Sequence, residues 1–303
     1  IVGDYRADYV PYLNTVVQSP RGSVLVHPSK QSTVRAIVAT AFRTPTFLES
    51  YIGNFIQLPI AGAQEVTNTR QIQPEQILTT ELGYLNSESD FVTFDSALFY
   101  NHVTNLIDIQ NVQGITVGDL ANGQVAQGAI PSTGLYPLFF GGFENQCQQY
   151  DVFGAELGAR VFPVEGLDLY ANYTLMDVSQ DPSHCSAEQR SLLALDARTS
   201  EHKVNTGVQL RTKAGIDGSI DFHFVSAQDW AEQVVDVAQQ RIVFESFHLD
   251  PYAIVNARIG YRFLQNHAEV SVAGFNILDD VHREHPFGQL VGRRIMGFLT
   301  YRF

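Results

Sequence analysis

The chain ends on the stretch VGRRIMGFLTYRF, residues 291–303, in which apolar and polar side chains alternate. Successive side chains of a β-strand point to opposite faces, so this alternation predicts a strand with two different faces. One face would carry Ile295, Gly297, Leu299, Tyr301 and Phe303, and the other Arg294, Met296, Thr300 and Arg302, with Phe298 as the exception. Most domains end in a few polar, poorly ordered residues. A chain that ends in such a pattern indicates that its C-terminus belongs to a sheet.

The same alternation recurs along the chain and predicts an all-β protein. Regular examples lie at residues 33–43, 153–161, 167–177, 203–210, 216–226 and 252–263. We expect about twelve strands in total, most of them close to the ~9–11 residues that a tilted strand needs to cross a bilayer.

Short and long connections alternate between these strands. Short ones are expected near residues 28–31, 86–90, 163–166, 213–217 and 264–266, and long ones over 45–74, 111–149, 178–200, 228–251 and 277–290. If the last strand runs toward the periplasm, every long connection lies outside the cell, which is typical of outer-membrane barrels. The pattern therefore predicts an antiparallel transmembrane β-barrel. A soluble β-sandwich or small soluble barrel also buries one face of each strand, and it stays open as an alternative.

The composition fits a folded protein and disfavours one class of partner. Hydrophobic residues make up 45% of the 303 residues, which argues against disorder. The net charge of -13 argues against nucleic acid as a partner, because phosphate binding needs a basic surface. No apolar run reaches the ~18 residues of a membrane helix. The chain begins with Ile and not Met, so we expect a processed protein or a segment of a longer one.

Five motifs follow one another in a fixed order. The first is a strand that ends in Phe42-Arg43-x-Pro45-Thr46, with Glu49 shortly after it. The others are QPEQILTTELGYLN (73–86), ALFYNHVTNLIDI (97–109), GFNILDD (274–280) and GRR…LTYRF at the C-terminus. In this order they resemble the TonB-dependent outer-membrane receptors over most of the chain, although Ile277 and Leu278 replace the Leu-Phe of the fourth motif.

The resemblance implies a barrel of about 22 strands around an N-terminal plug. Residues 1–303 would form the C-terminal part of that barrel domain, without the plug. The resemblance also implies a location in the outer membrane of a Gram-negative bacterium. The receptor would import a scarce ligand, such as a ferric siderophore, another metal chelate or cobalamin, with energy delivered by the TonB complex through the missing plug. Membrane lipid would be a further partner, and no cofactor is expected. The alternative is a complete, smaller barrel that acts as a passive pore or an outer-membrane hydrolase.

The two cysteines are expected to lie in neighbouring external connections. Cys147 would end one long connection and Cys185 would lie in the next. Adjacent strands are ~4.8 Å apart, and thiols outside the cytoplasm oxidise readily, so we expect a disulfide. Two free thiols remain the alternative, since bonding requires Cα atoms within ~7 Å.

Candidate ligand contacts lie at the outer rim and in the long connections. Arg43 ends a strand there, where it could meet an anionic ligand. Amphipathic Trp230 could lie at the membrane interface, pack its own loop or bind ligand. An aromatic group at Tyr136, Phe139 and Phe140 could bind ligand or form a small core of its loop. His282 and His285 flank Glu284 in the last connection, but their spacing is not that of a helical zinc motif, and we do not expect a metal site.

Charged residues share the other parity of the strands, which would face the barrel interior. There they are expected to bind water and the plug. They are Arg35, Arg43, Glu81, Asp95, Glu156, Arg160, Lys203, Arg211, Asp221, Arg258, Arg262, Arg294 and Arg302. The sequence contains no nucleophile elbow, phosphate loop or dinucleotide fingerprint, so we do not expect an enzyme and assign no catalytic residue.

Overall fold

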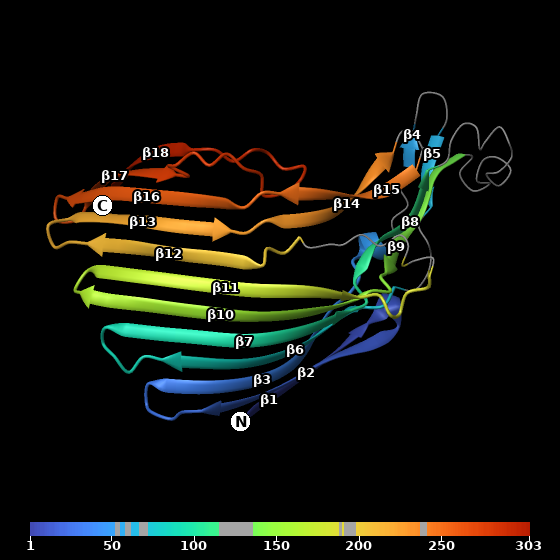
Figure 1. Ribbon diagram of the computed structural model, residues 1–303, viewed down its shortest axis with the longest axis horizontal. Coiled ribbons are helices and arrows are strands. Elements are labelled where there is room, and N and C mark those ends of the chain that lie inside the picture. Colours follow the sequence, from blue (N-terminus) through green and yellow to red (C-terminus); the bar gives the residue numbers. More distant parts are fainter. Residues whose placement is uncertain are drawn as a thin grey trace.

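The computed structural model describes residues 1–51, 55–57, 62–66, 72–114, 136–187, 190, 198–236 and 241–303. Twelve antiparallel strands form one sheet, which Figure 1 shows as a single layer with the two termini at opposite edges. In order across the sheet the strands are β1 (Val2–Val10), β2 (Thr15–Val26), β3 (Ser32–Arg43), β6 (Glu75–Asn86), β7 (Val92–Thr104), β10 (Gln149–Val164), β11 (Leu167–Asp181), β12 (His202–Arg211), β13 (Ile216–Val225), β16 (Tyr252–Phe263), β17 (Ala268–Phe275) and β18 (Arg294–Tyr301).

The long connections all lie at one end of this sheet, as expected, and the short ones lie at the other end, apart from residues 11–14 between β1 and β2. Tight turns join β2 to β3, β6 to β7, β10 to β11, β12 to β13 and β16 to β17, at the left in Figure 1. In two of them Gly166 and Gly215 have φ of 85° and 90°, a conformation that side chains disfavour. The long connections lie at the other end. The structure therefore has a short-turn end and a long-connection end.

The long connections carry strands of their own, which the alternation did not predict. A four-stranded sheet contains β4 (Phe55–Gln57), β5 (Gly62–Val66), β8 (Ile107–Gly114) and β9 (Tyr136–Asn145). The connection from β13 to β16 forms a hairpin of β14 (Gln228–Asp236) and β15 (Arg241–Leu249). A five-residue helix, α1 (Phe47–Tyr51), and a 3-10 turn, Pro11–Leu13, complete the described elements. None of the described helices is long and apolar enough to cross a membrane.

The two faces of the sheet differ in polarity. On one face Leu82 lies directly opposite Leu98, and these side chains are 52% and 51% exposed. Farther along the same face, Ile259 and Leu299 are 64% and 79% exposed. The buried apolar cluster of the described residues is small and holds Val10, Leu13 and Val17. A soluble sandwich would bury such a face against a second sheet, so this arrangement excludes that alternative and fits a lipid-facing surface.

The sheet does not close on itself. β1 and β18 are its two edges, and no pairing joins them within the described residues. This excludes a closed twelve-stranded barrel. The last strand ends at Tyr301 rather than Phe303, but the chain stays attached, since the Arg302 amide donates to the His267 carbonyl at 2.8 Å.

Candidate functional site

Two of the predicted ligand contacts, Trp230 and His285, meet at the long-connection end, and a third, His282, lies three residues before His285. The rings of Trp230 on β14 and His285, in the connection after β17, meet edge to face with centroids 4.7 Å apart. The Trp230 indole donates to Gln228 Oε1 at 2.9 Å, and the guanidinium carbon of Arg198 lies 5.3 Å from the indole centroid. We call Arg198, Trp230, Tyr252, His282 and His285 the rim cluster. It presents the Trp230 ring, the His285 imidazole and one guanidinium.

His282 is the buried member of the rim cluster. Its ring stacks on Tyr252 with centroids 4.0 Å apart and an angle of 8° between the planes. Its Nδ1 donates to the Asp280 carbonyl at 2.6 Å, because a carbonyl only accepts. Its side chain is only 6% exposed, and among the described residues its buried Nε2 has no hydrogen-bond partner. The Glu284 carboxylate lies 3.6 Å from Nε2.

The β14–β15 hairpin packs against the connection between β17 and β18. Besides the Trp230 contact, Phe247 and Phe287 meet edge to face at 5.2 Å. Within the hairpin, His248 Nδ1 and Asp229 Oδ1 are 2.7 Å apart. This hydrogen bond raises the pKa of the exposed His248 imidazole. The hairpin and the last connection thus form one wall at the long-connection end.

Metal binding has little support in the described residues. Nowhere among them do three or more His, Cys, Asp or Glu side chains gather in a way that could hold a metal ion. His282, Glu284 and His285 are close in sequence, but His285 uses its Nδ1 to accept from the Phe287 amide at 3.1 Å.

Arg43, the fourth predicted contact, is engaged by two carboxylates. Glu75 lies directly opposite it on β6, and its two oxygens accept from Nε and Nη2, both at 2.5 Å. Arg43 Nη1 donates to both oxygens of Glu49, at 2.9 and 3.0 Å. We call Arg43, Glu49 and Glu75 the arginine clamp. It ties the end of β3 to α1 and to the start of β6.

A capping box holds Glu49 in the arginine clamp. The Thr46 amide donates to Glu49 Oε2 at 2.6 Å, and the Glu49 amide donates to Thr46 Oγ1 at 3.2 Å. Burial raises the pKa of Glu49, but hydrogen bonds from Thr46 and Arg43 outweigh it and leave that pKa below its ordinary value. The Ile107 amide also donates to Glu75 Oε1 at 2.9 Å. Sequence reasoning missed these partners, although Thr46-x-x-Glu49 is itself a capping signal.

The aromatic group at Tyr136, Phe139 and Phe140 lies on a strand and not in a loop. These residues belong to β9, which pairs with β5 and with β8. Their side chains lie outside the described part of the structure, so their role as ligand contacts stays a prediction.

The expected disulfide is confirmed. Cys147 and Cys185 are bonded, with Cα atoms 5.0 Å apart. The bond joins the connection before β10 to the connection after β11, and Cys185 is 4% exposed.

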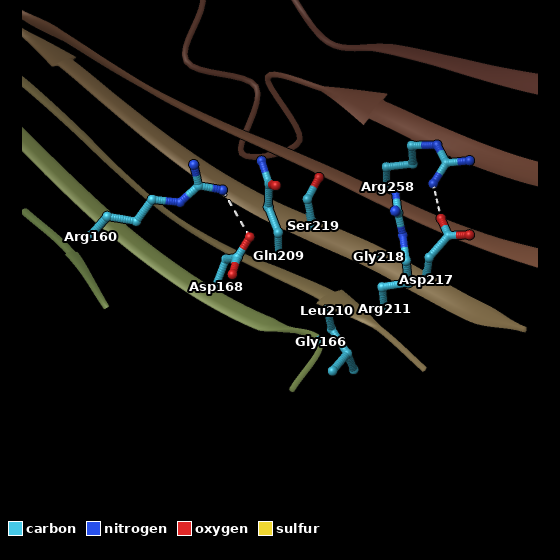
Figure 2. Close-up of a pocket in the computed structure, with 10 residues that line it drawn as sticks. All are labelled: Arg160, Gly166, Asp168, Gln209, Leu210, Arg211, Asp217, Gly218, Ser219 and Arg258. Atoms are coloured by element: carbon cyan, nitrogen blue, oxygen red, sulfur yellow. Dashed lines mark hydrogen bonds and ion pairs between the residues drawn. The ribbon is translucent and has the colours of Figure 1, made fainter. Parts of the chain in front are cut away.

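A polar cavity of about 490 Å³ lies on the charged face near the short-turn end. Figure 2 shows two ion pairs flanking it: Arg160 Nη2 with Asp168 Oδ2 at 2.8 Å, and Arg258 with Asp217. Arg258 also binds Glu269, and Arg262 Nε lies 3.2 Å from Asp217. The parity of the strands identified these arginines. It did not identify Asp168, Asp217 or Glu269 as their partners, because register decides which side chains meet.

This chain is similar to one family model and to several solved structures. A family model described as TonB dependent receptor-like, beta-barrel matches residues 2–277. A mutant of the ferric enterobactin receptor of Pseudomonas aeruginosa is similar in structure (TM-score 0.67, 17% identity), over 99% of this chain and 42% of that one. The ferripyoverdine receptor of the P. aeruginosa outer membrane, bound to ferripyoverdine, is similar over 95% and 34% (TM-score 0.61, 12% identity). The outer membrane transporter YddB from Escherichia coli is similar over 99% and 42% (TM-score 0.67, 10% identity).

At these identities the likeness shows the fold. The chain spans only 34% to 42% of the length of these three structures. No curated protein matches it in sequence. The family model, however, covers nearly the whole chain, and the order of strands, the two faces and the grouped long connections agree with it. The chain therefore belongs to the family of TonB-dependent receptor β-barrels, proteins of the Gram-negative outer membrane.

Proposed function

We propose that residues 1–303 are the C-terminal part of the barrel of a receptor that imports a scarce ligand across the outer membrane. The observation that carries the proposal is the asymmetry of the sheet, in which every long connection lies at one end. In an outer-membrane barrel that end faces the medium. The rim cluster and the arginine clamp then stand where a ligand arrives.

The chemistry of the rim cluster favours a ligand with flat, unsaturated and anionic groups. Trp230 and His285 offer ring faces and edges for stacking, and Arg198 offers a cation beside them. Ferric siderophores carry such groups, and the related structures include receptors for ferric enterobactin and ferripyoverdine. Cobalamin or another metal chelate is the alternative within the same proposal.

Closure of the barrel and coupling to TonB need parts of the protein outside this chain. We propose that β1 and β18 pair with strands outside residues 1–303, because a strand edge facing lipid would leave backbone groups without hydrogen bonds. We also propose that a plug fills the interior and contacts TonB. The proposal assigns no catalytic residue.

Uptake by the full-length receptor tests this function. A strain that lacks the gene is grown with ferric siderophores as the only iron source, or with cobalamin as the limiting nutrient, and is then complemented. We expect complementation to restore uptake of one ligand in a TonB-dependent manner. Uptake that stays unchanged when the TonB complex is removed would instead indicate a passive pore. A receptor that binds none of these ligands would overturn the proposal.

Substitution in the rim cluster tests the site. Trp230→Ala should weaken binding of that ligand about tenfold or more, the usual effect of removing a buried aromatic contact. Phe91→Ala is the control, since Phe91 is an aromatic residue 62% exposed in a short turn at the other end of the sheet. If the Trp230→Ala and Phe91→Ala receptors bind the ligand with equal affinity, the rim cluster is not part of the binding site.

A further inference from the structure

The backbone pairing of the sheet has a gap between β2 and β3 at the long-connection end. β2 pairs with β1 along residues 15–23, and β3 pairs with β6 along its whole length. Between β2 and β3, however, the pairing of the described residues begins only at Arg21 and Ala39 and continues toward the short turn. Residues 15–20 and 40–43 are therefore strand edges that no ladder joins. We call this gap the seam.

Pro20 explains where the seam begins. Proline has no backbone N–H and cannot donate to a neighbouring strand. The ladder to β1 continues past Pro20, with Tyr5 directly opposite, whereas the ladder to β3 ends at the adjacent residue, Arg21. The seam reaches the level of Arg43, where β3 ends. We expect water at this level to satisfy the free backbone groups, which the lipid interior would leave unsatisfied.

Side-chain contacts close the seam in place of hydrogen bonds between the strands. A small buried cluster comes from the tip of the β1–β2 hairpin, and one aromatic ring of β3 packs against it. We call this group the apolar latch, and it consists of Val10, Leu13, Val17 and Phe42. The Arg6 guanidinium carbon lies 6.0 Å from the Phe42 ring centroid, and the Tyr12 hydroxyl donates to the Pro45 carbonyl. The hairpin tip is thus held to β3 by contacts that a small movement would break.

The side chain of Thr40 opposes this closed arrangement. Thr40 lies on β3 at the seam, and its buried hydroxyl has no hydrogen-bond partner within the described part of the chain. A buried hydroxyl without a partner costs free energy, because it has lost its hydrogen bonds to water. Opening of the seam would return water to this hydroxyl. The closed seam is therefore favoured by the apolar latch and disfavoured by Thr40.

We infer that the tip of the β1–β2 hairpin, residues 9–20, is a flap that swings away from β3 about Pro20 and opens the barrel wall sideways at its rim. The inference goes beyond the proposed function, because it concerns the wall and holds for any imported ligand. In Figure 1 the flap belongs to the blue strands at one edge of the sheet, and the rim cluster belongs to connections near the other edge. Opening of the flap therefore widens the mouth of the barrel on the side away from the rim cluster.

Distances between two spin labels in the full-length receptor test this motion. One label replaces Val16 on the flap and the other replaces Leu98 on β7, because both side chains are exposed. The native cysteines are bonded to each other and do not take the label. Phe42→Ala removes the ring of the apolar latch and should add a population with a longer distance. Labels at Gly22 and Leu98 are the control, since Gly22 is paired on both sides and its distance to β7 should stay unchanged. A distance distribution that is the same in wild type and Phe42→Ala would overturn the inference.

Replacement of Pro20 tests the hinge. Pro20→Val supplies the missing N–H and a side chain that suits a strand, so the ladder between β2 and β3 can extend along the seam. The distance distribution from Val16 to Leu98 should become narrower than in the wild type. In the double variant with Phe42→Ala, the population with the longer distance should disappear. If the double variant keeps that population, Pro20 is not the hinge.

The reactivity of a thiol in the seam gives a second measurement. Thr40→Cys should react with a water-soluble methanethiosulfonate reagent several-fold faster when Phe42→Ala is present, and Pro20→Val should reverse this increase. Ser96→Cys is the control, because β7 is paired on both sides at Ser96, and its rate should be the same in every variant. Equal increases at positions 40 and 96 would indicate a loosened barrel and contradict the inference. Heat-modifiable gel migration checks that each receptor is folded. Neither measurement needs a ligand, so failure of the proposed function leaves both tests valid.

Discussion

Tyr170 on β11 lies across Gly207, the residue directly opposite it on β12, and reaches the next strand. Its hydroxyl donates a 2.6 Å hydrogen bond to Asp221 on β13. A Cβ at position 207 would lie 2.6 Å from Tyr170 Cε1, closer than atoms can approach. The glycine therefore makes room for a tyrosine that links three strands.

Gly207→Ala should push Tyr170 off this path and lower stability by about 1–3 kcal/mol, the usual effect of overpacking. The temperature at which the full barrel loses its folded gel migration measures the change. Gly22→Ala is the matched control, since Gly22 lies on β2 between β1 and β3 and nothing lies within 4 Å of a Cβ at that position. If both variants shift this temperature equally, the close approach of Tyr170 to Gly207 does not contribute to stability.

The disulfide should matter for the long connections more than for the barrel wall. Cys147 and Cys185 are separated by 38 residues, and closing a loop of that size stabilises by about 3–4 kcal/mol in the chain-entropy estimate. Replacing both cysteines by Ser should therefore speed limited proteolysis between β7 and β10 while strand pairing survives. Proteolysis unchanged in the double variant would contradict this expectation.

The arginine clamp should hold α1 in place at neutral pH. The pKa of Glu49 in the folded protein is below its ordinary 4.5, so its stabilising contribution is present above that value and is lost as the pH falls through the lowered pKa. Because Arg43 is partly exposed, Arg43→Ala should cost only about 1 kcal/mol locally. Hydrogen exchange of residues 47–51 measures this local loss of stability. The exchange rates of wild type and variant should differ at pH 7 and become equal in acid.

Arg43→Lys separates positioning from ligand binding. The lysine ammonium keeps the charge but cannot reproduce the paired hydrogen bonds to Glu75. The hydrogen-exchange rates of residues 47–51 should therefore lie between those of the wild type and those of Arg43→Ala. Weaker ligand binding with unchanged exchange in both variants would support a direct ligand contact for Arg43 instead.

The β14–β15 hairpin should become more mobile as the pH rises. The pKa of His248 is raised in the folded state by Asp229, so its contribution is fully present below the ordinary imidazole pKa and is lost as the pH rises through the raised value. Asp229→Asn should remove this dependence. Hydrogen exchange of residues 241–249 between pH 5 and 9, corrected for intrinsic rates, measures it. A pH profile that survives Asp229→Asn would assign the effect to another group.

Alternation predicted the wall of the barrel because lipid and water impose it on each strand. The segment at 252–263 was expected as a strand, and β16 has those bounds. The sequence also placed each long connection to within six residues at either end and predicted the disulfide. It could not predict β14, β15 or the four-stranded sheet, since these strands lie in the long connections and lack the regular alternation of the wall strands. The sequence could not predict the arginine clamp either, because the contact of Arg43 with Glu75 depends on a strand register that no local pattern specifies.

The disulfide has a consequence for membrane insertion. Cys147 precedes β10 and Cys185 follows β11, so the bond turns this hairpin into a covalent ring. For a chain that enters the membrane from the short-turn side, the open end of the hairpin must travel across the bilayer. If the thiols oxidise before this step, the two long connections cross together as one body, and the translocation path must be wide enough for both at once.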